Sequence, residues 1–377
     1  MFARLRYKCF ILIMLLLLAV LSSGCSGAKQ ADLPSNVKAP GMSGTKTITD
    51  CAGHQVEIPA HVERIGCLYA FSGHVMAMLE KGQEIVAVVD GLKRDVLLTE
   101  MCPNIKNALV PSSSGAVNVE ELAKAAPDIV FVKSDTAQSE GEAEKLQKIK
   151  IPYLVVDYRN IKEQQYAIEM IGQVVGAADK AGKYNDYYQQ CIDRVQARLK
   201  DLPLKDRVRV FHSVNEATRT DTADTLPADW LKTVAAIDVS VYEKLKLVEG
   251  KYFASLEQIF LWDPDVITVN EPGVAGYIMN NTQWSTLRAV KDRKVYQMPL
   301  GISRWGHPGS LETPLAILWT AKTLYPDRFT DLDMVAETKT FYKEFFHCDL
   351  TDDVVNKILS GNGMRTLKHE SETDKKN

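Results

Sequence analysis

Several features that would indicate an enzyme or a nucleic-acid-binding protein are missing from this sequence. The formal charge is only −3, so no basic excess is present to attract nucleic acid. No GxSxG, HExxH or P-loop motif occurs, and the seven histidines are scattered along the chain. No two cysteines have the CxxC spacing of zinc or iron–sulfur sites. We therefore expect no catalytic residue, no resident cofactor and no resident metal site of the zinc or iron–sulfur type, and we predict that the chain is not an enzyme.

Only one long apolar run is present, and it lies near the N-terminus. A basic start precedes an uninterrupted apolar stretch from Phe10 to Leu21. A stretch this short is typical of the core of a signal peptide, because a membrane span needs roughly 20 apolar residues. The run therefore predicts export of the protein from the cytoplasm.

The residues that follow this run resemble the lipobox of bacterial lipoproteins, with Cys25 as its cysteine and Ser22 where leucine is usual. The resemblance implies a signal peptide at 1–24, a diacylglycerol on the Cys25 thiol and a location on the extracytoplasmic face of the cell membrane. The Ser-, Gly-, Pro-, Ala- and Lys-rich segment 25–45 predicts a flexible tether. The alternative is a plain secretory signal in which Cys25 has no role.

Cys9 leaves with the predicted signal peptide and Cys25 is the predicted anchor, so the cysteines that remain are odd in number. One or two disulfides are compatible with an extracytoplasmic location, although the sequence does not pair them. The alternative is buried free thiols, because Cys67 and Cys191 lie within apolar patterns. The full set is Cys51, Cys67, Cys102, Cys191 and Cys348.

A repeated segment organises the body of the chain. Residues 119–132 (VEELAKAAPDIVFV) and 256–269 (LEQIFLWDPDVITV) align without a gap. In each, a glutamate near the start (Glu120, Glu257) is followed by Pro-Asp and then by a β-branched run. This order predicts a short helix that proline ends, followed by a strand buried on both faces. Two such units predict an α/β fold of two lobes with mainly parallel sheets.

The segments around the repeats support this prediction. We expect a hairpin at 47–59, helices at 72–79 and 226–236, and strands at 64–68, 84–89, 153–156, 208–212 and 294–297. Between the repeats, the spacing of apolar residues predicts two helices with a break near Gly176. The second would be about 36 Å long at 1.5 Å per residue, which is enough to join two lobes. The alternative is an amphipathic helix packed on one lobe.

About 330 residues follow the tether, more than one hydrophobic core usually supports. We therefore predict an N-terminal lobe, a helical segment containing one long interlobe helix, and a C-terminal lobe, with a ligand cleft between the lobes. A C-terminal helix and a disordered tail complete the chain. The predicted bounds are 46–160, 161–203, 204–346 and 347–377.

The order of these elements resembles the helix-linked (class III) periplasmic binding proteins of ABC importers. The resemblance rests on TDCAGHQVEIP, ERIGCLYAFS, both Glu–Pro-Asp segments, the long helix and VYQMPLGISRW, and it covers Thr45 to Phe346. It implies a monomer that binds a small metal chelate and partners a permease dimer with its ATPase. It also implies that Glu120 and Glu257 dock on arginines of the two permease subunits. The alternative is that each glutamate favours the positive end of its helix dipole.

Ligands of α/β folds bind at the carboxyl ends of strands, which selects candidate residues in both lobes. The first lobe offers Tyr69, Phe71 and Ser72, and the second offers Asn215, Asn270 and Tyr277. These positions predict a binding site in the cleft between the lobes.

A third group, Arg304, Trp305 and His307, lies on the loop after the last predicted strand. Arginine suits anionic oxygens, tryptophan supplies a stacking face, and histidine donates a hydrogen bond or ligates a metal. The alternative is that Arg304 forms a salt bridge within its lobe, Trp305 belongs to the core and His307 only shapes the following helix.

The class of ligand stays open at this level. We rank a ferric siderophore or another iron chelate first, a corrinoid or haem second, and an oxyanion such as molybdate or tungstate third. The same body could also serve as a ligand-sensing lipoprotein without transport, because fold alone does not set function.

Overall fold

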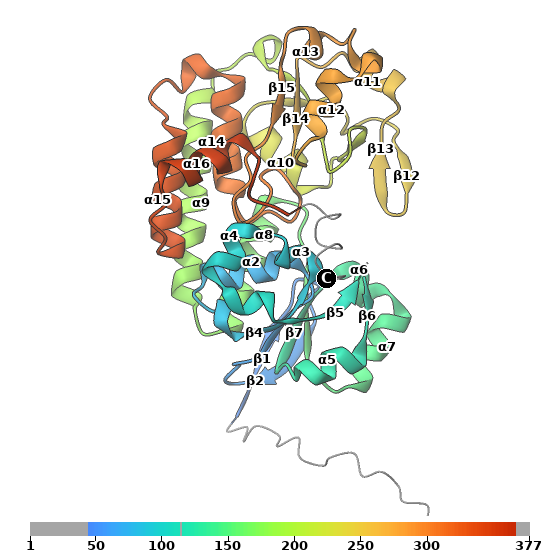
Figure 1. Ribbon diagram of the computed structural model, residues 1–377, viewed down its shortest axis with the longest axis vertical. Helices are drawn as coiled ribbons and strands as arrows, with labels where there is room; N and C mark the ends of the chain where they lie inside the picture. Colours follow the sequence, from blue (N-terminus) through green and yellow to red (C-terminus); the bar gives the residue numbers. More distant parts are fainter. Residues whose placement is uncertain (1–43, 114, 367–377) are drawn as a thin grey trace, which may run out of the picture. The chain divides into compact units, whose positions relative to one another are not determined.

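The computed structural model describes residues 44–113 and 115–366. Cys25 and the predicted signal peptide therefore lie outside the described residues, as does most of the predicted tether. Two sheets with mainly parallel strands and helices packed around them make up the fold (Figure 1). This confirms the predicted α/β class. None of the described helices is both long and apolar enough to cross a membrane.

The N-terminal sheet has the strand order β6-β5-β4-β3-β7-β8. Its pairs are parallel except for β5 with β6, which is antiparallel. The central strands β3 and β7 are almost entirely buried, which explains their continuous apolar sequence. The strands are β3 (Ile65–Cys67), β4 (Ile85–Val89), β5 (Leu109–Ser113), β6 (Ala116–Val117), β7 (Ile129–Lys133) and β8 (Tyr153–Val156).

The C-terminal sheet has the order β11-β9-β14-β15, and all of its pairs are parallel. A small antiparallel sheet, β10-β13-β12, lies beside it. The strands of the larger sheet are β9 (Arg209–Ser213), β11 (Ile237–Asp238), β14 (Val266–Val269) and β15 (Val295–Gln297), and those of the smaller are β10 (Arg219–Thr220), β12 (Lys246–Val248) and β13 (Lys251–Phe253).

The predicted hairpin is present as β1 (Thr45–Thr49) and β2 (Gln55–Pro59). Asp50 fixes its turn, because Oδ1 accepts hydrogen bonds from the backbone N–H groups of Ala52 and His54 at 3.0 and 2.8 Å. The second oxygen, Oδ2, accepts the N–H of Val155 at 3.1 Å and so ties the hairpin to β8.

The two repeats fold alike, as predicted. Helix α5 (Val119–Ala125) leads into β7, and α11 (Leu256–Trp262) leads into β14. The prediction that proline ends each helix needs a correction. The residue before each proline does leave the right-handed helical region, but it enters the left-handed one, with φ of 45° at Ala126 and 41° at Asp263.

Matching contacts hold both turns. Asp128 Oδ2 accepts the N–H of Arg64 at 2.9 Å, and Asp265 Oδ2 accepts the N–H of Arg209 at 2.9 Å. The Arg64 side chain donates to Ala125 and Ala126 carbonyl oxygens, and that of Arg209 to the Trp262 carbonyl oxygen. The aspartate and the arginine are therefore a shared device that joins the end of each helix to the start of the neighbouring strand.

Helices α9, α14, α15 and α16 gather on one side of the molecule (Figure 1). The predicted break between helices occurs at Gly176, whose φ is 68°. Helix α9 packs against α8 and α14, and one hydrophobic core cluster includes residues from both sheets and from these helices. The helices are α8 (Ile161–Val174), α9 (Ala178–Leu199), α14 (Thr313–Leu324), α15 (Met334–Phe346) and α16 (Asp352–Ser360).

The long helix is not the only link between the two halves of the described chain. Near the C-terminus, the N–H of Val96 donates to the Met364 carbonyl oxygen at 3.2 Å, and Thr366 donates to Arg94 at 2.9 Å. Arg365 also forms an ion pair with the buried Asp95. The end of the described chain therefore returns to the N-terminal half. The division into lobes at 160 and 203 stays a prediction.

The remaining helices are short and lie mostly between strands. They are α2 (Ala70–Met78), α3 (Asp90–Lys93), α4 (Val96–Met101), α6 (Ser134–Gln138), α7 (Glu140–Lys148), α10 (Leu226–Thr233), α12 (Val274–Asn280) and α13 (Arg288–Lys291). Single 3₁₀ turns are η1 (Gly82–Glu84), η2 (Pro103–Lys106), η3 (Leu204–Asp206), η4 (Thr282–Trp284) and η5 (Pro326–Arg328).

All five cysteines of the described residues are free thiols. Cys67 and Cys191 are buried in the core, as their apolar surroundings in the sequence indicated. Burial raises the pKa of both thiols to about 12. They therefore behave as small apolar side chains at neutral pH.

Candidate functional site

The candidate site is built on loops that follow the carboxyl ends of parallel strands. Strand β15 leads into a loop, residues 298–312, that precedes α14 and carries Arg304 and His307. Strand β9 leads into a tight turn that carries Asn215, and β14 leads directly into Asn270 and Glu271. The strand-end rule thus brings several of the predicted residues to one edge of the C-terminal sheet.

A buried carboxylate holds the loop 298–312 in shape. Glu312 Oε2 accepts hydrogen bonds from the backbone N–H and the hydroxyl of Ser303 at 2.8 and 2.9 Å. Its Oε1 accepts the Tyr342 hydroxyl at 2.5 Å, and that hydroxyl accepts the N–H of Ile302 at 2.9 Å. Burial raises the pKa of Glu312, and these hydrogen bonds oppose the rise. Hydrogen bonds to the buried Glu312 and Tyr342 therefore fix the conformation of the loop before any ligand binds.

Arg304 is tied to the neighbouring strand ends. Its Nη1 donates to Asn215 Oδ1 at 2.5 Å and forms an ion pair with Glu271. The side chain is 15 % exposed, and this burial is the main cause that lowers the pKa of Arg304. The sequence analysis gave a salt bridge within the lobe as the alternative to ligand binding, and Arg304 does form one. The Nε and Nη2 groups, however, donate to no acceptor in the described part of the chain.

His307 presents a neutral N–H group. Its Nδ1 accepts the backbone N–H of Gly309 at 2.9 Å, so the ring proton of the neutral form lies on Nε2. Burial, and then the positive charges of Arg304 and Arg219, hold the pKa of His307 well below its usual range. Within residues 44–113 and 115–366, no acceptor receives the Nε2–H. The ring is therefore a neutral hydrogen-bond donor at physiological pH.

Arg219 is a candidate that the sequence analysis missed. It begins β10 and is half-buried. Burial is the main cause that lowers the pKa of Arg219; the charges of Asp221 and Glu216 oppose this, and the charge of Arg304 adds to it. The charge of Arg219 in turn lowers the pKa of His307. Its guanidinium forms no hydrogen bond or ion pair with any described residue. The strand-end rule that selected Asn215 could have found it, because only five residues separate β9 from Arg219.

Tyr69 approaches the same loop from the N-terminal half. It precedes the first residue of α2, and its hydroxyl donates to the Tyr158 hydroxyl at 3.1 Å. A Cβ atom placed on Gly309 would lie 3.4 Å from the Tyr69 hydroxyl and 3.3 Å from His307 Nδ1. Tyr69 and His307 therefore flank one glycine. Burial raises the pKa of Tyr69, so its hydroxyl is neutral.

Four predicted residues are buried and support this surface from beneath. Phe71 and Trp305 are fully buried in the main core cluster, and Ser72 donates its hydroxyl to the Tyr69 carbonyl oxygen at 2.7 Å. The buried Asn270 accepts the N–H of Asn215 at 2.9 Å. Direct contact of these four side chains with a ligand stays a prediction.

Tyr277, on α12, is the one predicted residue that stands apart from this cluster. Its side chain is 53 % exposed and forms no ring contact or hydrogen bond with the other candidates of the described chain. Within those residues, no group of three or more His, Cys, Asp or Glu side chains could hold a metal ion.

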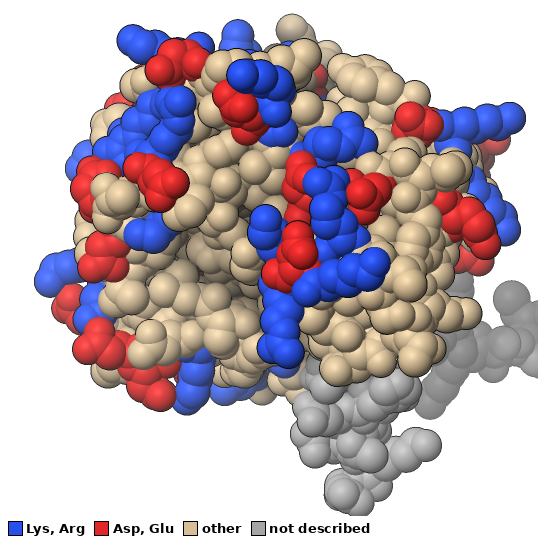
Figure 2. Space-filling model, turned by 90° about the horizontal axis from the view of Figure 1, so that it is seen from above, with Lys and Arg blue, Asp and Glu red and all other residues tan. Residues whose placement is uncertain are grey.

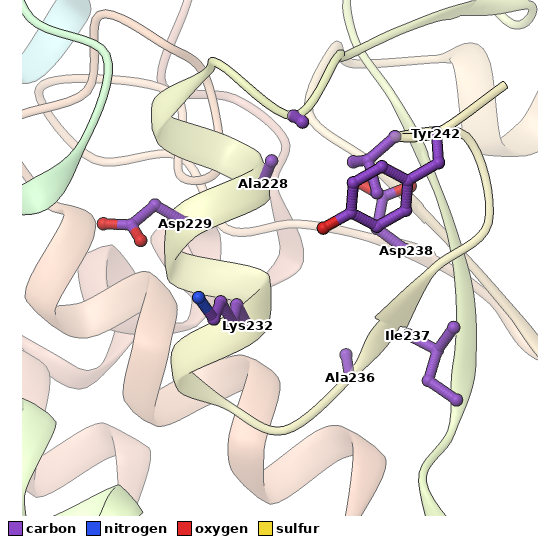
Figure 3. A pocket seen from close by; sticks show the side chains of 9 residues that line it. Ala228, Asp229, Lys232, Ala236, Ile237, Asp238 and Tyr242 are labelled. Atoms are coloured by element: carbon purple, nitrogen blue, oxygen red, sulfur yellow. The ribbon is translucent and has the colours of Figure 1, made fainter. Parts of the chain in front are cut away.

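A separate cavity of about 310 Å³ opens on the C-terminal half between α10 and β11 (Figure 3). Asp229 and Lys232 project from α10, and Asp238 and Tyr242 lie opposite them (Figure 3). None of the predicted ligand-binding residues lines it. We favour the Arg304 cluster as the site, because unpaired donors converge there at the ends of strands.

The predicted docking glutamates are exposed on the equivalent helices of the two repeats. Asn118 caps α5 by accepting the N–H groups of Glu120 and Glu121, each at 3.1 Å, and Ser255 caps α11. Seen from the top of Figure 1, basic and acidic side chains are interspersed, and neither sign forms a continuous patch on that face (Figure 2).

The fold and the site together define a class of protein: two α/β halves with hydrogen-bond donors at the ends of their strands are the build of an extracytoplasmic solute receptor. The chain belongs to the periplasmic binding protein family, whose sequence profile matches residues 67–300. Substrate-binding proteins of ABC transporters deliver their ligand to a permease and its ATPase.

Individual relatives agree with this assignment. The molybdate-binding protein MolA of Haemophilus influenzae is 27 % identical over 331 residues, 82 % of this chain and 93 % of that protein. The uncharacterized ABC transporter substrate-binding lipoprotein YvrC of Bacillus subtilis is 25 % identical over 84 % of this chain and 97 % of its own. A periplasmic solute-binding protein of Veillonella parvula shares the fold with a TM-score of 0.72, at 24 % identity over 84 % of this chain and 97 % of that one. The named relatives are binding proteins, in agreement with a role other than catalysis.

Proposed function

We propose that this protein is a lipid-anchored receptor of an ABC importer that captures a compact oxyanion of the molybdate or tungstate type. One observation carries the proposal: Arg304 Nε and Nη2, the Arg219 guanidinium and the His307 Nε2–H have no acceptor within the described residues, and the charges of both arginines act on His307. Glu271 pairs with Arg304, and the charges of Asp221 and Glu216 raise the pKa of Arg219, but the charge of Arg304 still lowers it. A divalent anion beside both guanidinium groups would offset this repulsion. Membership of the family is already assigned above, and the proposal adds the identity of the ligand.

A small ligand is favoured because few aromatic side chains are free to contact a large one. Siderophores and haem need broad aromatic faces as well as charge, but Trp305 and Phe71 are buried in the core. A tetrahedral oxyanion needs only hydrogen-bond donors around a small volume. MolA, the relative cited above, is named for molybdate. These points move the oxyanion ahead of the iron chelate that the sequence favoured.

An iron chelate remains the second candidate, because Tyr69 and His307 flank Gly309. A phenol and an imidazole on either side of one residue are groups that ligate ferric iron or haem iron. A ferric siderophore would be an anionic cargo for the same arginines, and haem or cobalamin would depend more on the tyrosine. A receptor that senses its ligand without transport is separated from an importer by the docking experiment described in the Discussion.

Attachment and delivery complete the proposal. Cys25 carries the lipid, which agrees with the lipoprotein named among the relatives. Glu120 and Glu257 orient the receptor on two basic sites of the permease, where exposed ion pairs speed and align the encounter more than they tighten it.

A titration panel tests the cargo. Purified protein is titrated with molybdate, tungstate, sulfate, a set of ferric siderophores, haem and cobalamin while tryptophan fluorescence is recorded. We expect saturable binding of molybdate and tungstate and none of cobalamin. Saturable binding of a ferric siderophore without any response to the oxyanions would replace the first candidate with the second.

A further inference from the structure

Helices α5 and α11, which carry the predicted docking glutamates, are built alike but differ in the side chains that they expose. Counting from the shared glutamate, the residue four positions later is Lys124 in α5 and Leu261 in α11. Residues four apart lie on the same face of a helix, so each of these side chains lies beside its glutamate. The N-terminal docking helix therefore presents a carboxylate with an amine, and the C-terminal one a carboxylate with an isobutyl group.

Leu261 has no packing role within the described structure. Its neighbours Ile259, Phe260 and Trp262 pack in or against the core cluster of the C-terminal half, whereas Leu261 is 85 % exposed. Among the residues that the structure describes, few large apolar side chains are this exposed, and this one lies directly next to the predicted docking carboxylate.

Helix α11 holds Leu261 in a fixed position. At its N-terminus, Ser255 and Gln258 form a reciprocal capping box. Beyond its C-terminus, Arg288 forms ion pairs with Asp263 at 3.2 Å and Asp265 at 2.7 Å. A short helix held at both ends presents its exposed face with little loss of entropy on binding.

We infer that α11 docks on the permease as a mixed contact, in which Glu257 meets a basic residue and Leu261 enters an apolar depression beside it. The inference rests on the proposed function, because it takes the permease as the partner. It follows that the two ends of the receptor are not equivalent. The α11 end supplies most of the affinity, since burial of a leucine contributes more than an exposed ion pair.

The two ends lie far apart, which makes them separable by mutation: α5 and α11 are near opposite ends of the described molecule in the view of Figure 1. A substitution in one helix therefore leaves the contact at the other intact. It also leaves the Arg304 cluster intact, because neither helix contributes a residue to it.

The test measures the Kd between the full-length receptor and its permease–ATPase complex in nanodiscs, without ligand, so that the result does not depend on the cargo. Leu261→Lys, which copies the α5 pattern, should weaken binding at least about tenfold. The matched control is Leu204→Lys, because Leu204 is 70 % exposed in η3 and should leave the Kd unchanged. Lys124→Leu should strengthen binding or leave it as it is.

Two results separate the failure of this inference from the failure of the proposed function. If Leu261→Lys binds like the unmodified receptor while Glu257→Ala binds weakly, the apolar contact is absent and docking by glutamate stands. If neither the unmodified receptor nor any variant binds the complex, the proposed transport role fails as well. An equal loss in Leu261→Lys and Leu204→Lys would also overturn the inference, because it would show a general effect of added charge.

Discussion

The Nδ1 atom of His307 accepts a hydrogen bond of 2.9 Å from the backbone N–H of Gly309. This contact fixes the tautomer, and with it the chemistry of the site, because the proton of the neutral ring must then lie on Nε2. The positive charges of Arg304 and Arg219 oppose a second proton. His307 is therefore a neutral hydrogen-bond donor that lies near two positively charged arginines.

This tautomer predicts how binding depends on pH. Burial and the charges of Arg304 and Arg219 hold the pKa of His307 well below its usual value of 6.5, so the ring is neutral between pH 7.5 and 6.5. Affinity for molybdate should therefore stay constant over that range. His307→Gln keeps an N–H donor and should retain most of the affinity, whereas His307→Leu should lose about tenfold. Titration calorimetry at both pH values checks this, and tighter binding of the unmodified protein at pH 6.5 would show that the ring becomes charged.

Docking is tested by removing both exposed carboxylates. Glu120→Ala combined with Glu257→Ala should abolish ligand uptake in reconstituted vesicles while the affinity for ligand stays unchanged, because neither residue touches the Arg304 cluster. Glu243→Ala with Glu249→Ala removes the same charge from the same chain and serves as the control. Undiminished uptake by the first pair would place docking elsewhere, or would favour the sensing role.

The loop 298–312 explains one strict requirement for glycine. A Cβ atom at Gly301 would collide with Glu312 Oε1 and with the Tyr342 hydroxyl, the two groups that hold the loop. Gly301→Ala should therefore lower the free energy of unfolding by about 2 kcal/mol. Gly276→Ala is the matched control, since open space surrounds Gly276 within α12 and alanine favours a helix. Urea unfolding measures both, and equal stability of the two variants would contradict this account of the loop.

His212 supports the same loop and predicts a pH effect on stability. Its Nε2–H donates to the Gly306 carbonyl oxygen at 3.0 Å, and its Nδ1 accepts the hydroxyl of Thr268 at 2.9 Å. Burial lowers the pKa of His212 to about 4. Between pH 6.5 and 4 the unfolded chain therefore binds a proton at this residue that the folded protein does not, so this residue's contribution to stability falls as the pH is lowered.

The change in stability due to His212 should reach about 1.4 kcal/mol per pH unit in that window. In His212→Gln the contribution disappears, so the loss of stability between pH 6.5 and 5 should be smaller than in the unmodified protein. Comparison of the two slopes removes the effect of other groups. Asp238, whose pKa is raised by burial to about 6, acts in the opposite direction and is common to both proteins. Identical slopes would contradict the assignment.

Much of the fold could be predicted because its signals are local. The Glu–Pro-Asp repeat, the buried β-branched runs and the break at Gly176 each depend on neighbours in the sequence. The return of Met364–Thr366 to the N-terminal half could not be predicted, because it depends on Asp95, which lies 270 residues from its partner Arg365. No periodicity reports a pairing of that kind.

The site was predictable in position and less so in detail. The strand-end rule selected the loops that carry Arg304, His307 and Tyr69, because all parallel strands of a sheet end on the same edge. Burial of Phe71 and Trp305 depends on tertiary packing, so the sequence could not separate aromatic residues that face a ligand from those of the core. Arg219 was missed although only five residues separate it from the end of β9, because the residues selected after that strand ended within the turn.

The central claim is that an anion binds between two arginines, and titration calorimetry of single variants with molybdate tests it most directly. Arg304→Ala and Arg219→Ala should each weaken binding by at least about tenfold through the loss of a charge-assisted hydrogen bond. Arg288→Ala removes an arginine paired with Asp263 and Asp265 and should leave the Kd as it was. An affinity for molybdate that is the same in all three variants as in the unmodified protein would contradict the account.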